Sequence, residues 1–153
     1  MEDRKIDIAQ NKKARFEYEI DDTMEAGIVL KGTEVKAVRQ KKVSIQEAYA
    51  RIKDGEAYIV GMTISPYEMG NQFNHEPTRE RKLLLHRQEI KRLTGKLKEK
   101  GFTLVPLKVY IKNGRVKILL GLGKGKTRYD KRKTIQKREA DRELQRALKR
   151  DNR

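Results

Sequence analysis

Hydrophobic and polar residues alternate in the first part of the chain, and this alternation predicts short antiparallel strands. Phe16, Tyr18 and Ile20 each have polar neighbours on both sides. Such period-two spacing is typical of a half-buried strand. We expect Asp21-Asp22 to turn the chain into a second strand at residues 28–30, because acidic residues favour turns.

Apolar residues at helical spacing predict two helices. Val35 and Val38 are three positions apart, which favours a short helix at about residues 34–40. A longer helix is expected at about residues 87–99, where the following residues share one helical face: Ile90, Leu93 and Leu97.

Two dipeptides that favour tight hairpins connect the remaining strands. Asp54-Gly55 joins expected strands at about residues 46–53 and 56–62. The clearest hairpin consists of residues 102–112, Asn113-Gly114 and residues 115–122. Because five or six antiparallel strands need closure to hide their edges, we expect an OB-like closed antiparallel β-barrel of about six strands with peripheral helices.

The triplet Leu83-Leu84-Leu85 follows a loop that is dense in turn formers, at residues 65–77. Whether the triplet starts the next helix or forms a short strand, Leu84 cannot share the direction of Leu83. We therefore expect one leucine of the triplet to face solvent or a partner.

Three parts of the chain differ in charge and in hydrophobic pattern. Residues 1–10 are charged and unpatterned and predict a mobile N-terminal arm, residues 11–122 form the expected barrel, and residues 123–153 form a basic C-terminal tail. The N-terminus has no apolar stretch of the length that a secretion signal needs, so we expect a cytoplasmic protein.

Positive charge is concentrated in the last fifth of the chain. The 153 residues have a net charge of +16, and residues 121–153, with 13 Lys/Arg and 5 Asp/Glu, carry +8 of it. Such charge favours a polyanionic partner, above all nucleic acid. An anionic membrane is the competing partner, but the chain has no apolar run of about 18 residues and the tail has few large apolar residues. We expect no membrane partner.

The tail has a sparse apolar stripe of Ile135, Leu144 and Leu148. This stripe is too small to hold a helix on its own. We expect a segment that is disordered when free and becomes helical inside an RNA-walled channel. The alternative is a tail that stays unstructured throughout.

No constellation of residues favours catalysis, a cofactor or a metal. Cysteine is absent, and His75 and His86 are the only histidines, which argues against a zinc site. Gly125-Lys126-Thr127 resembles the end of a phosphate-binding loop, but Leu120 stands where the first glycine of that motif is required. We expect the glycines at 121, 123 and 125 to form a flexible hinge instead.

Glu25 and Lys117 each allow two interpretations. Glu25 is either a solvated turn residue or a hydrogen-bond acceptor for a base edge or a 2′-hydroxyl, which Lys and Arg cannot provide. Lys117 is either an outward-facing polar residue of the final strand or a phosphate contact.

Several strings of the sequence resemble, in order, motifs of the SmpB (small protein B, SsrA-binding protein) family. They are Asn11-Lys-Lys-Ala14, Glu25-Ala-Gly-Ile28, Gly32-Thr-Glu-Val-Lys36 with Arg39, Pro77-Thr-Arg-Glu-Arg-Lys-Leu-Leu-Leu-His86 and Gly125-Lys-Thr-Arg-Tyr-Asp-Lys-Arg132. The resemblance runs from about residue 11 to the end. It implies an OB-like barrel, a transfer-messenger RNA (tmRNA) partner and a role in trans-translation, in which ribosomes stalled on truncated messages are rescued.

The resemblance also implies roles for single residues. Glu25, Leu84 and Lys117 match positions that hold the tRNA-like domain of tmRNA, and Asn11, Lys12, Lys36 and Arg39 match positions near the same RNA face. Ribosome contacts in the decoding centre and the empty message channel are implied for these tail residues: Gly125 as a hinge, Tyr129, Asp130, Lys131, Arg132, Ile135 and Leu148.

Two other classes of protein share some of these features. A ribosomal or rRNA-binding structural protein would also combine a small barrel with a basic tail. A nucleotide-dependent enzyme rests on the defective phosphate-loop string alone. We expect an adaptor that is not an enzyme, acts as a monomer and needs no cofactor.

Overall fold

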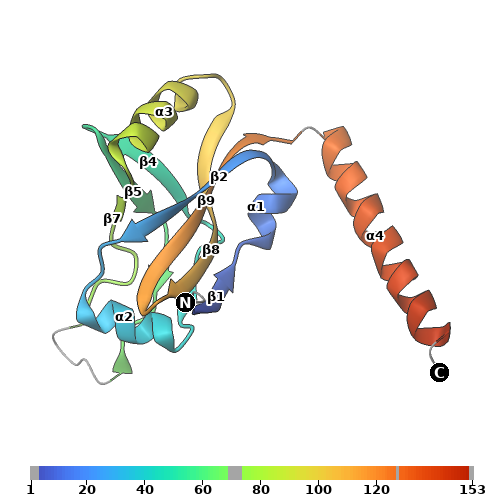
Figure 1. Ribbon diagram of the computed structural model, residues 1–153, viewed down its shortest axis with the longest axis horizontal. Coiled ribbons are helices and arrows are strands. Elements are labelled where there is room, and N and C mark those ends of the chain that lie inside the picture. The colour runs from blue at the N-terminus through green and yellow to red at the C-terminus, as the bar shows by residue number, and fades with distance from the viewer. Residues whose placement is uncertain (1–3, 69–73, 127, 152–153) are drawn as a thin grey trace.

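The computed structural model describes residues 4–68, 74–126 and 128–151, with side chains of the last range at 132–133 and 135–149 (Figure 1). Its strands are β1 (Lys5–Gln10), β2 (Tyr18–Ile28), β3 (Val43–Ser44), β4 (Tyr49–Lys53), β5 (Glu56–Val60), β6 (Thr63–Ile64), β7 (Arg81–Leu84), β8 (Phe102–Lys112) and β9 (Arg115–Gly125). Its helices are α1 (Lys12–Glu17), α2 (Gly32–Arg39), α3 (Arg87–Leu97) and α4 (Arg128–Asp151).

Six antiparallel strands form a closed ring. The sheet order is β1-β8-β4-β5-β7-β2-β9, and β9 pairs back onto β8, so β1 is the one strand of this sheet that lies outside the ring. β3 and β6 form a separate two-stranded sheet. The predicted closed, mainly β fold with peripheral helices is confirmed. Closure of the ring leaves few strand edges unpaired.

Both predicted hairpins are confirmed. Asp54 and Gly55 have φ values of 53° and 75°, and Asn113 and Gly114 have 52° and 78°. Two successive left-handed residues make the turn that matches the twist of the flanking strands. The second hairpin is longer than expected, since β9 continues to Gly125.

The start of the chain differs from the prediction in two places. Phe16 belongs to helix α1, and β2 runs without a turn from Tyr18 to Ile28. A shift in register between Ile20 and Asp22 marks a bulge where we expected a turn, because an extra residue in one strand bends it without ending it.

Residues 5–10, which we expected to belong to a mobile arm, form strand β1. β4 pairs with β8 only at Ala50 and Leu104, so most of that edge of β8 is open. β1 pairs antiparallel along it, with Lys5 opposite Lys112. The open edge of an 11-residue strand accounts for the order of this segment.

The ring encloses one main hydrophobic core. Alternate residues of the strands face inward, among them Ile59, Leu83 and Ile118, which are fully buried. Helices α2 and α3 lie at opposite ends of the body (Figure 1) and contribute Val38 and Leu93 to this core. The two predicted helices are therefore confirmed: α2 begins two residues earlier and ends one residue earlier than expected, and α3 ends two residues earlier.

Helix α4 projects away from the body (Figure 1). Its large apolar residues Ile135, Leu144 and Leu148 are 43%, 61% and 55% exposed. The Arg138 guanidinium of this helix lies 5.7 Å from the Phe16 ring centroid of α1. In the part of the chain that the structure describes, no helix is long and apolar enough to span a membrane.

The glycines at 121 and 123 do not form the expected hinge. Both lie inside β9, where a Cβ on Gly121 would be 2.8 Å from Leu107 Cδ1 and one on Gly123 would be 2.9 Å from Ile20 Cδ1 and 3.1 Å from the Glu19 carbonyl oxygen. They allow close packing against neighbouring strands. Only Gly125, the last residue of β9, has open space around it.

We predict that Gly123→Ala lowers the free energy of unfolding by about 1–3 kcal/mol, since the added methyl group must displace packed neighbours. Gly125→Ala is the matched control and should leave stability nearly unchanged, because nothing lies within 4 Å of its Cβ position. Urea unfolding of both variants measures the difference. Equal stability of the two would contradict the packing role of Gly123.

Candidate nucleic-acid interface

Three adjacent strands bring Leu84, Gly27 and Lys117 into one row. Gly27 of β2 is directly paired with Leu84 of β7 on one side and with Lys117 of β9 on the other. Glu25 lies two residues along β2, so its side chain points to the same outer face as this row. We call these four residues the β7–β2–β9 row. The three residues implied by the resemblance are thus assembled on one surface.

The direction of Leu84 confirms the expectation for the leucine triplet. Leu83 is 1% exposed in the core, whereas Leu84 is 52% exposed on the outer face. A Cβ on Gly27 would lie 3.2 Å from the Leu84 Cβ, so the glycine lets the leucine side chain lie across β2. Leu84, Lys117 and Val35 of α2 line a shallow groove of about 260 Å³.

Glu25 is held in place as a charged acceptor. The Tyr110 hydroxyl donates a hydrogen bond to its carboxylate, and Lys112 Nζ lies 3.6 Å from the same oxygen. The Tyr110 hydrogen bond, together with Lys112 and Lys117, keeps the pKa of Glu25 below its ordinary value despite partial burial. The carboxylate is therefore ionised at neutral pH, and its side chain remains 37% exposed. Glu25 thus lies within strand β2 and not in the turn that one interpretation placed it in.

Tyr110 and Lys112 are members of the site that the sequence analysis missed. Tyr110 is buried, and Lys5 Nζ of β1 lies 4.4 Å from its ring centroid. Burial and the Glu25 carboxylate raise the pKa of Tyr110, so its hydroxyl stays a donor. The alternation along β8 could have placed both residues on the outer face, but only the β8–β9 and β2–β9 registers bring them to Glu25.

Asn11 does not lie on the RNA face that the resemblance implied. Its side chain is buried, donates to the carbonyls of Ile45 and Pro106 at 3.1 and 2.9 Å, and accepts from the Ala14 amide at 3.0 Å. All of its hydrogen-bonding groups are used to cap α1 and to attach it to the barrel. Asn11 is therefore structural.

The other residues implied for the RNA face are split between two places. Lys36 and Arg39 are exposed on α2, the helix whose Val35 borders the row. Lys12 is exposed on α1, which precedes the far end of β2. Nine residues separate Tyr18 from Gly27, or roughly 30 Å of strand. The structure therefore brings Lys36 and Arg39 toward the row and leaves Lys12 away from it.

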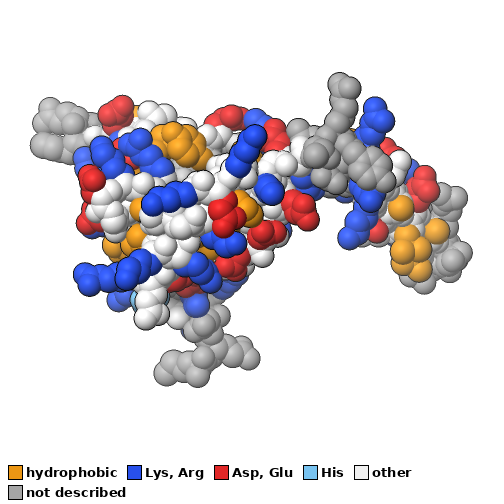
Figure 2. Space-filling view, turned by 90° about the horizontal axis from the view of Figure 1, so that it is seen from above, with side chains coloured by type: hydrophobic (Ala, Val, Ile, Leu, Met, Phe, Trp, Pro, Cys, Tyr) orange, Lys and Arg blue, Asp and Glu red, His pale blue; other side chains and the backbone are white. Residues whose placement is uncertain are grey.

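The tail residues lie at the opposite end of β9 from Lys117. Eight residues, or roughly 26 Å of strand, separate Lys117 from Gly125. Arg132, Ile135 and Leu148 are exposed on α4. The side chains of Tyr129, Asp130 and Lys131 lie outside the described residues. Figure 2 shows Lys and Arg side chains on both the body and the tail, with Asp and Glu side chains among them.

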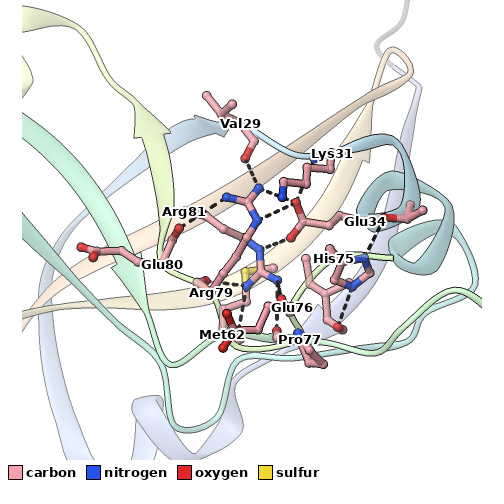
Figure 3. A network of polar contacts seen from close by, with 12 residues as sticks. Val29, Lys31, Glu34, Met62, His75, Glu76, Pro77, Arg79, Glu80 and Arg81 are labelled. Atoms are coloured by element: carbon pink, nitrogen blue, oxygen red, sulfur yellow. Dashed lines mark hydrogen bonds and ion pairs between the residues drawn. The ribbon is translucent and has the colours of Figure 1, made fainter. Parts of the chain in front are cut away.

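A buried ionic network fixes the strand that carries Leu84 (Figure 3). Glu34 of α2 is fully buried, and its carboxylate accepts hydrogen bonds from Arg79 Nε at 3.0 Å and from Arg81 Nε. Arg81 is also fully buried and donates to the carbonyl oxygens of Met62 and Pro77 at 2.8 and 3.0 Å. We call Glu34, Arg79 and Arg81 the Glu34 clasp.

The clasp connects the ends of three elements. Arg79 donates to the Val29 carbonyl at 3.3 Å just after β2, and the Lys31 amide donates to Glu34 at 2.8 Å at the start of α2. Burial by itself raises the pKa of Glu34, but the Arg79 and Arg81 hydrogen bonds and the Lys31 amide outweigh it and leave that pKa below its ordinary value. Two motifs of the sequence, one around Glu34 and one around Arg79–Arg81, are therefore bound to each other by these hydrogen bonds.

His75 supports the same region. It is buried, and its ring nitrogens lie 2.9 Å from Thr33 Oγ1 and 2.8 Å from the Ile64 carbonyl. Both ring nitrogens of His75 therefore have protein partners. Within the described residues, no group of three or more His, Cys, Asp or Glu side chains could hold a metal ion.

Comparison with known proteins decides the family. The model of the SmpB protein family matches residues 8–150. The chain belongs to the SmpB family. The SsrA-binding protein of Acetivibrio thermocellus is 61% identical over 142 residues, which are 93% of this chain and 92% of that protein. The SsrA-binding protein of a Geobacillus species is 58% identical with the same coverage.

A solved SmpB structure has the same fold. It is described as "tmRNA-SmpB: a journey to the center of the bacterial ribosome", and it matches with a TM-score of 0.68 and 48% sequence identity. The match covers 85% of this chain and 95% of that one. The SmpB fold of this chain is therefore shared with a family member of solved structure.

We predict that Glu34→Gln lowers the free energy of unfolding by about 3–5 kcal/mol at pH 7, since it leaves two buried arginines without their anion. Because the pKa of Glu34 is lowered by folding, the ionised carboxylate stabilises the fold above its ordinary pKa of 4.5, and this stabilisation is lost as pH falls below it. The difference in free energy of unfolding between the wild-type chain and Glu34→Gln should therefore become smaller at acidic pH.

Denaturant unfolding at several pH values between 3 and 7 measures this gap. Glu47→Gln removes an exposed carboxylate paired with Lys13 and should have little effect at any pH. A loss of stability in Glu34→Gln that is the same at every pH would contradict the stabilising role of the ionised Glu34 carboxylate in the clasp.

Proposed function

We propose that this chain is an RNA-binding adaptor that binds the tRNA-like domain of tmRNA and delivers it to stalled ribosomes in the cytoplasm for trans-translation. The observation that carries the proposal is the β7–β2–β9 row, where Leu84, Gly27 and Lys117 are in register beside Glu25. The names of the relatives, SsrA-binding proteins, and the tmRNA-SmpB structure support it. The role is that of an adaptor without catalysis.

The row provides three kinds of contact to RNA. Lys117 offers a cation for a phosphate, and Glu25 offers an ionised acceptor for a 2′-hydroxyl or a base amino group. Tyr110 and Lys112 hold Glu25 so that its carboxylate needs little reorientation on binding. Leu84 offers apolar surface for a sugar or a base edge. Cations alone would bind any polyanion, so Glu25 and Leu84 supply the selectivity.

The tail has the second task in this proposal. Its exposed basic helix enters the message channel only when no message occupies it, and Tyr129, Asp130, Lys131 and Arg132 contact the decoding centre. Ile135 and Leu148 then pack against the channel. Gly125 acts as the hinge, in keeping with the open space around it. Since the apolar side chains of α4 are exposed, the helix is stable only when the ribosome surrounds it.

We predict that Lys117→Ala and Glu25→Ala each weaken binding of an isolated tRNA-like domain about tenfold or more, the effect of losing a charged hydrogen bond. Lys117→Ala should also make the logarithmic salt dependence of affinity shallower by about one unit. Lys53→Ala, an exposed lysine at the β4–β5 turn, is the control with the same charge loss. Equal RNA affinity of Lys117→Ala and Lys53→Ala would contradict the proposal that the β7–β2–β9 row binds the RNA.

Deletion of residues 131–153 should spare RNA binding and instead abolish activity on the ribosome. Most of the affinity for the isolated RNA at physiological salt should remain, because exposed tail cations add only a screened, non-specific contribution. Peptide tagging on ribosomes stalled in a reconstituted translation system should be abolished. A large loss of RNA affinity, or normal tagging, would overturn the division of tasks between body and tail.

A further inference from the structure

A second groove lies on the other side of the β8–β9 turn from the β7–β2–β9 row. It has a volume of about 510 Å³ and lies between β1, the end of α2 and the turn at Asn113-Gly114. Three isoleucines line it: Ile6, Ile8 and Ile111. Ile6 is 56% exposed, so a large apolar side chain is left open to solvent here.

The rim of this groove is cationic. Arg4, Arg39 and Lys41 line it, and among the residues that the structure describes no Asp or Glu does. Among the described residues, none of these three side chains forms an ion pair. Some exposed cations elsewhere on the body do have carboxylate partners, as in Lys13–Glu47, Arg51–Glu80 and Lys82–Glu56. The rim therefore presents three unneutralised charges to an external anion.

Lys41 occupies this rim in a costly backbone conformation. Its φ is 60°, just past the end of α2, where glycine is the least strained residue. Its amide donates to the Val38 carbonyl at 2.9 Å, and the Lys42 amide donates to the Ala37 carbonyl at 3.0 Å, which holds this conformation. A lysine at such a position places a charge on the rim that glycine would lack.

An unpaired nucleotide fits both parts of the groove. A base face can cover the isoleucines and stack on the Arg39 guanidinium, while its phosphate meets the cationic rim. The volume is within the range of small-ligand pockets, roughly 300–1,000 Å³. A paired base would keep its face inside the helix, and a phosphate alone would leave the apolar floor uncovered. Acidic peptides are less suited, since a single residue offers less flat apolar area.

The groove is continuous with the RNA surface already described. Gly114 lines both grooves, and α2 borders both, with Val35 in one and Arg39 in the other. We propose that the groove of Ile6, Ile8 and Ile111 holds one unpaired nucleotide of the same RNA that the β7–β2–β9 row binds. This inference rests on the proposed function and extends its site around the Asn113-Gly114 turn.

The test compares groove variants of the full chain with matched variants on α4. Ile6→Asn and Arg39→Gln should each weaken binding of the tRNA-like domain about fivefold to tenfold, the loss of one stacked base contact. Leu144→Asn and Arg142→Gln, which change exposed residues of α4, should leave affinity unchanged. Circular dichroism of each variant verifies folding.

Chemical probing of the RNA bases provides the second measurement. At saturating protein, at least one unpaired base should be protected from dimethyl sulfate by the wild-type chain and by Leu144→Asn but not by Ile6→Asn. Normal affinity and unchanged protection with both groove variants would overturn the groove inference. If Lys117→Ala still weakened binding in that case, the proposed function would stand.

Two further outcomes are distinguishable. If neither the groove variants nor Lys117→Ala changed affinity, the proposed function would fail together with the groove inference. If the groove variants kept RNA affinity but lost a protein that co-purifies with the wild-type chain, the occupant would be a peptide and the nucleotide proposal would be wrong.

Discussion

The short pairing of β2 with β7 is the constraint on which the RNA surface depends. It consists of two residue pairs, Gly27 with Leu84 and Ile28 with Leu83, and of one further bond from the Val29 amide to the Lys82 carbonyl. Without it the strand ring would open, and Leu84 would lose its place beside Lys117. Two pairs are too few to fix a register by themselves. The buried Glu34 clasp, which binds the Val29 carbonyl on one side and the start of β7 on the other, supplies the missing rigidity.

In the proposed function, this arrangement separates RNA capture from ribosome sensing along a single strand. β9 carries Lys117 near its start and Gly125 at its end. Gly121 and Gly123 are packed against Leu107 and Ile20, so the strand is rigid between these two points. In the proposed function, the tail changes its direction at Gly125, where open space surrounds the glycine, without disturbing the row. Charge follows the same division, since half of the net positive charge lies in residues 121–153.

Local patterns predicted local structure well. Asp54-Gly55 and Asn113-Gly114 determined their turns because few other residues adopt two successive left-handed conformations. That Leu83 and Leu84 point in different directions followed from the sequence pattern alone, and the family resemblance indicated that Leu84 is the exposed one. The bulge after Ile20 and the helix at Phe16 were missed, because a bulge leaves no period of its own and α1 depends on the capping by Asn11. Strand β1 was missed because its pairing is set by the open edge of β8, about 100 residues away in the sequence. The partners of Tyr110 and Arg81 are also distant in sequence. Strand register brings Tyr110 to Glu25, and the position of helix α2 brings Glu34 to Arg81.

The central claim is that the outer face of β7, β2 and β9 captures the RNA while the tail remains free. Amide chemical-shift mapping by NMR tests it directly, with isotope-labelled full-length chain titrated with the isolated tRNA-like domain of tmRNA. The largest shifts should occur at Glu25, Gly27, Leu84 and Lys117, with small changes along residues 132–149. Large shifts confined to residues 132–149, with the four residues of the row unchanged, would contradict the account.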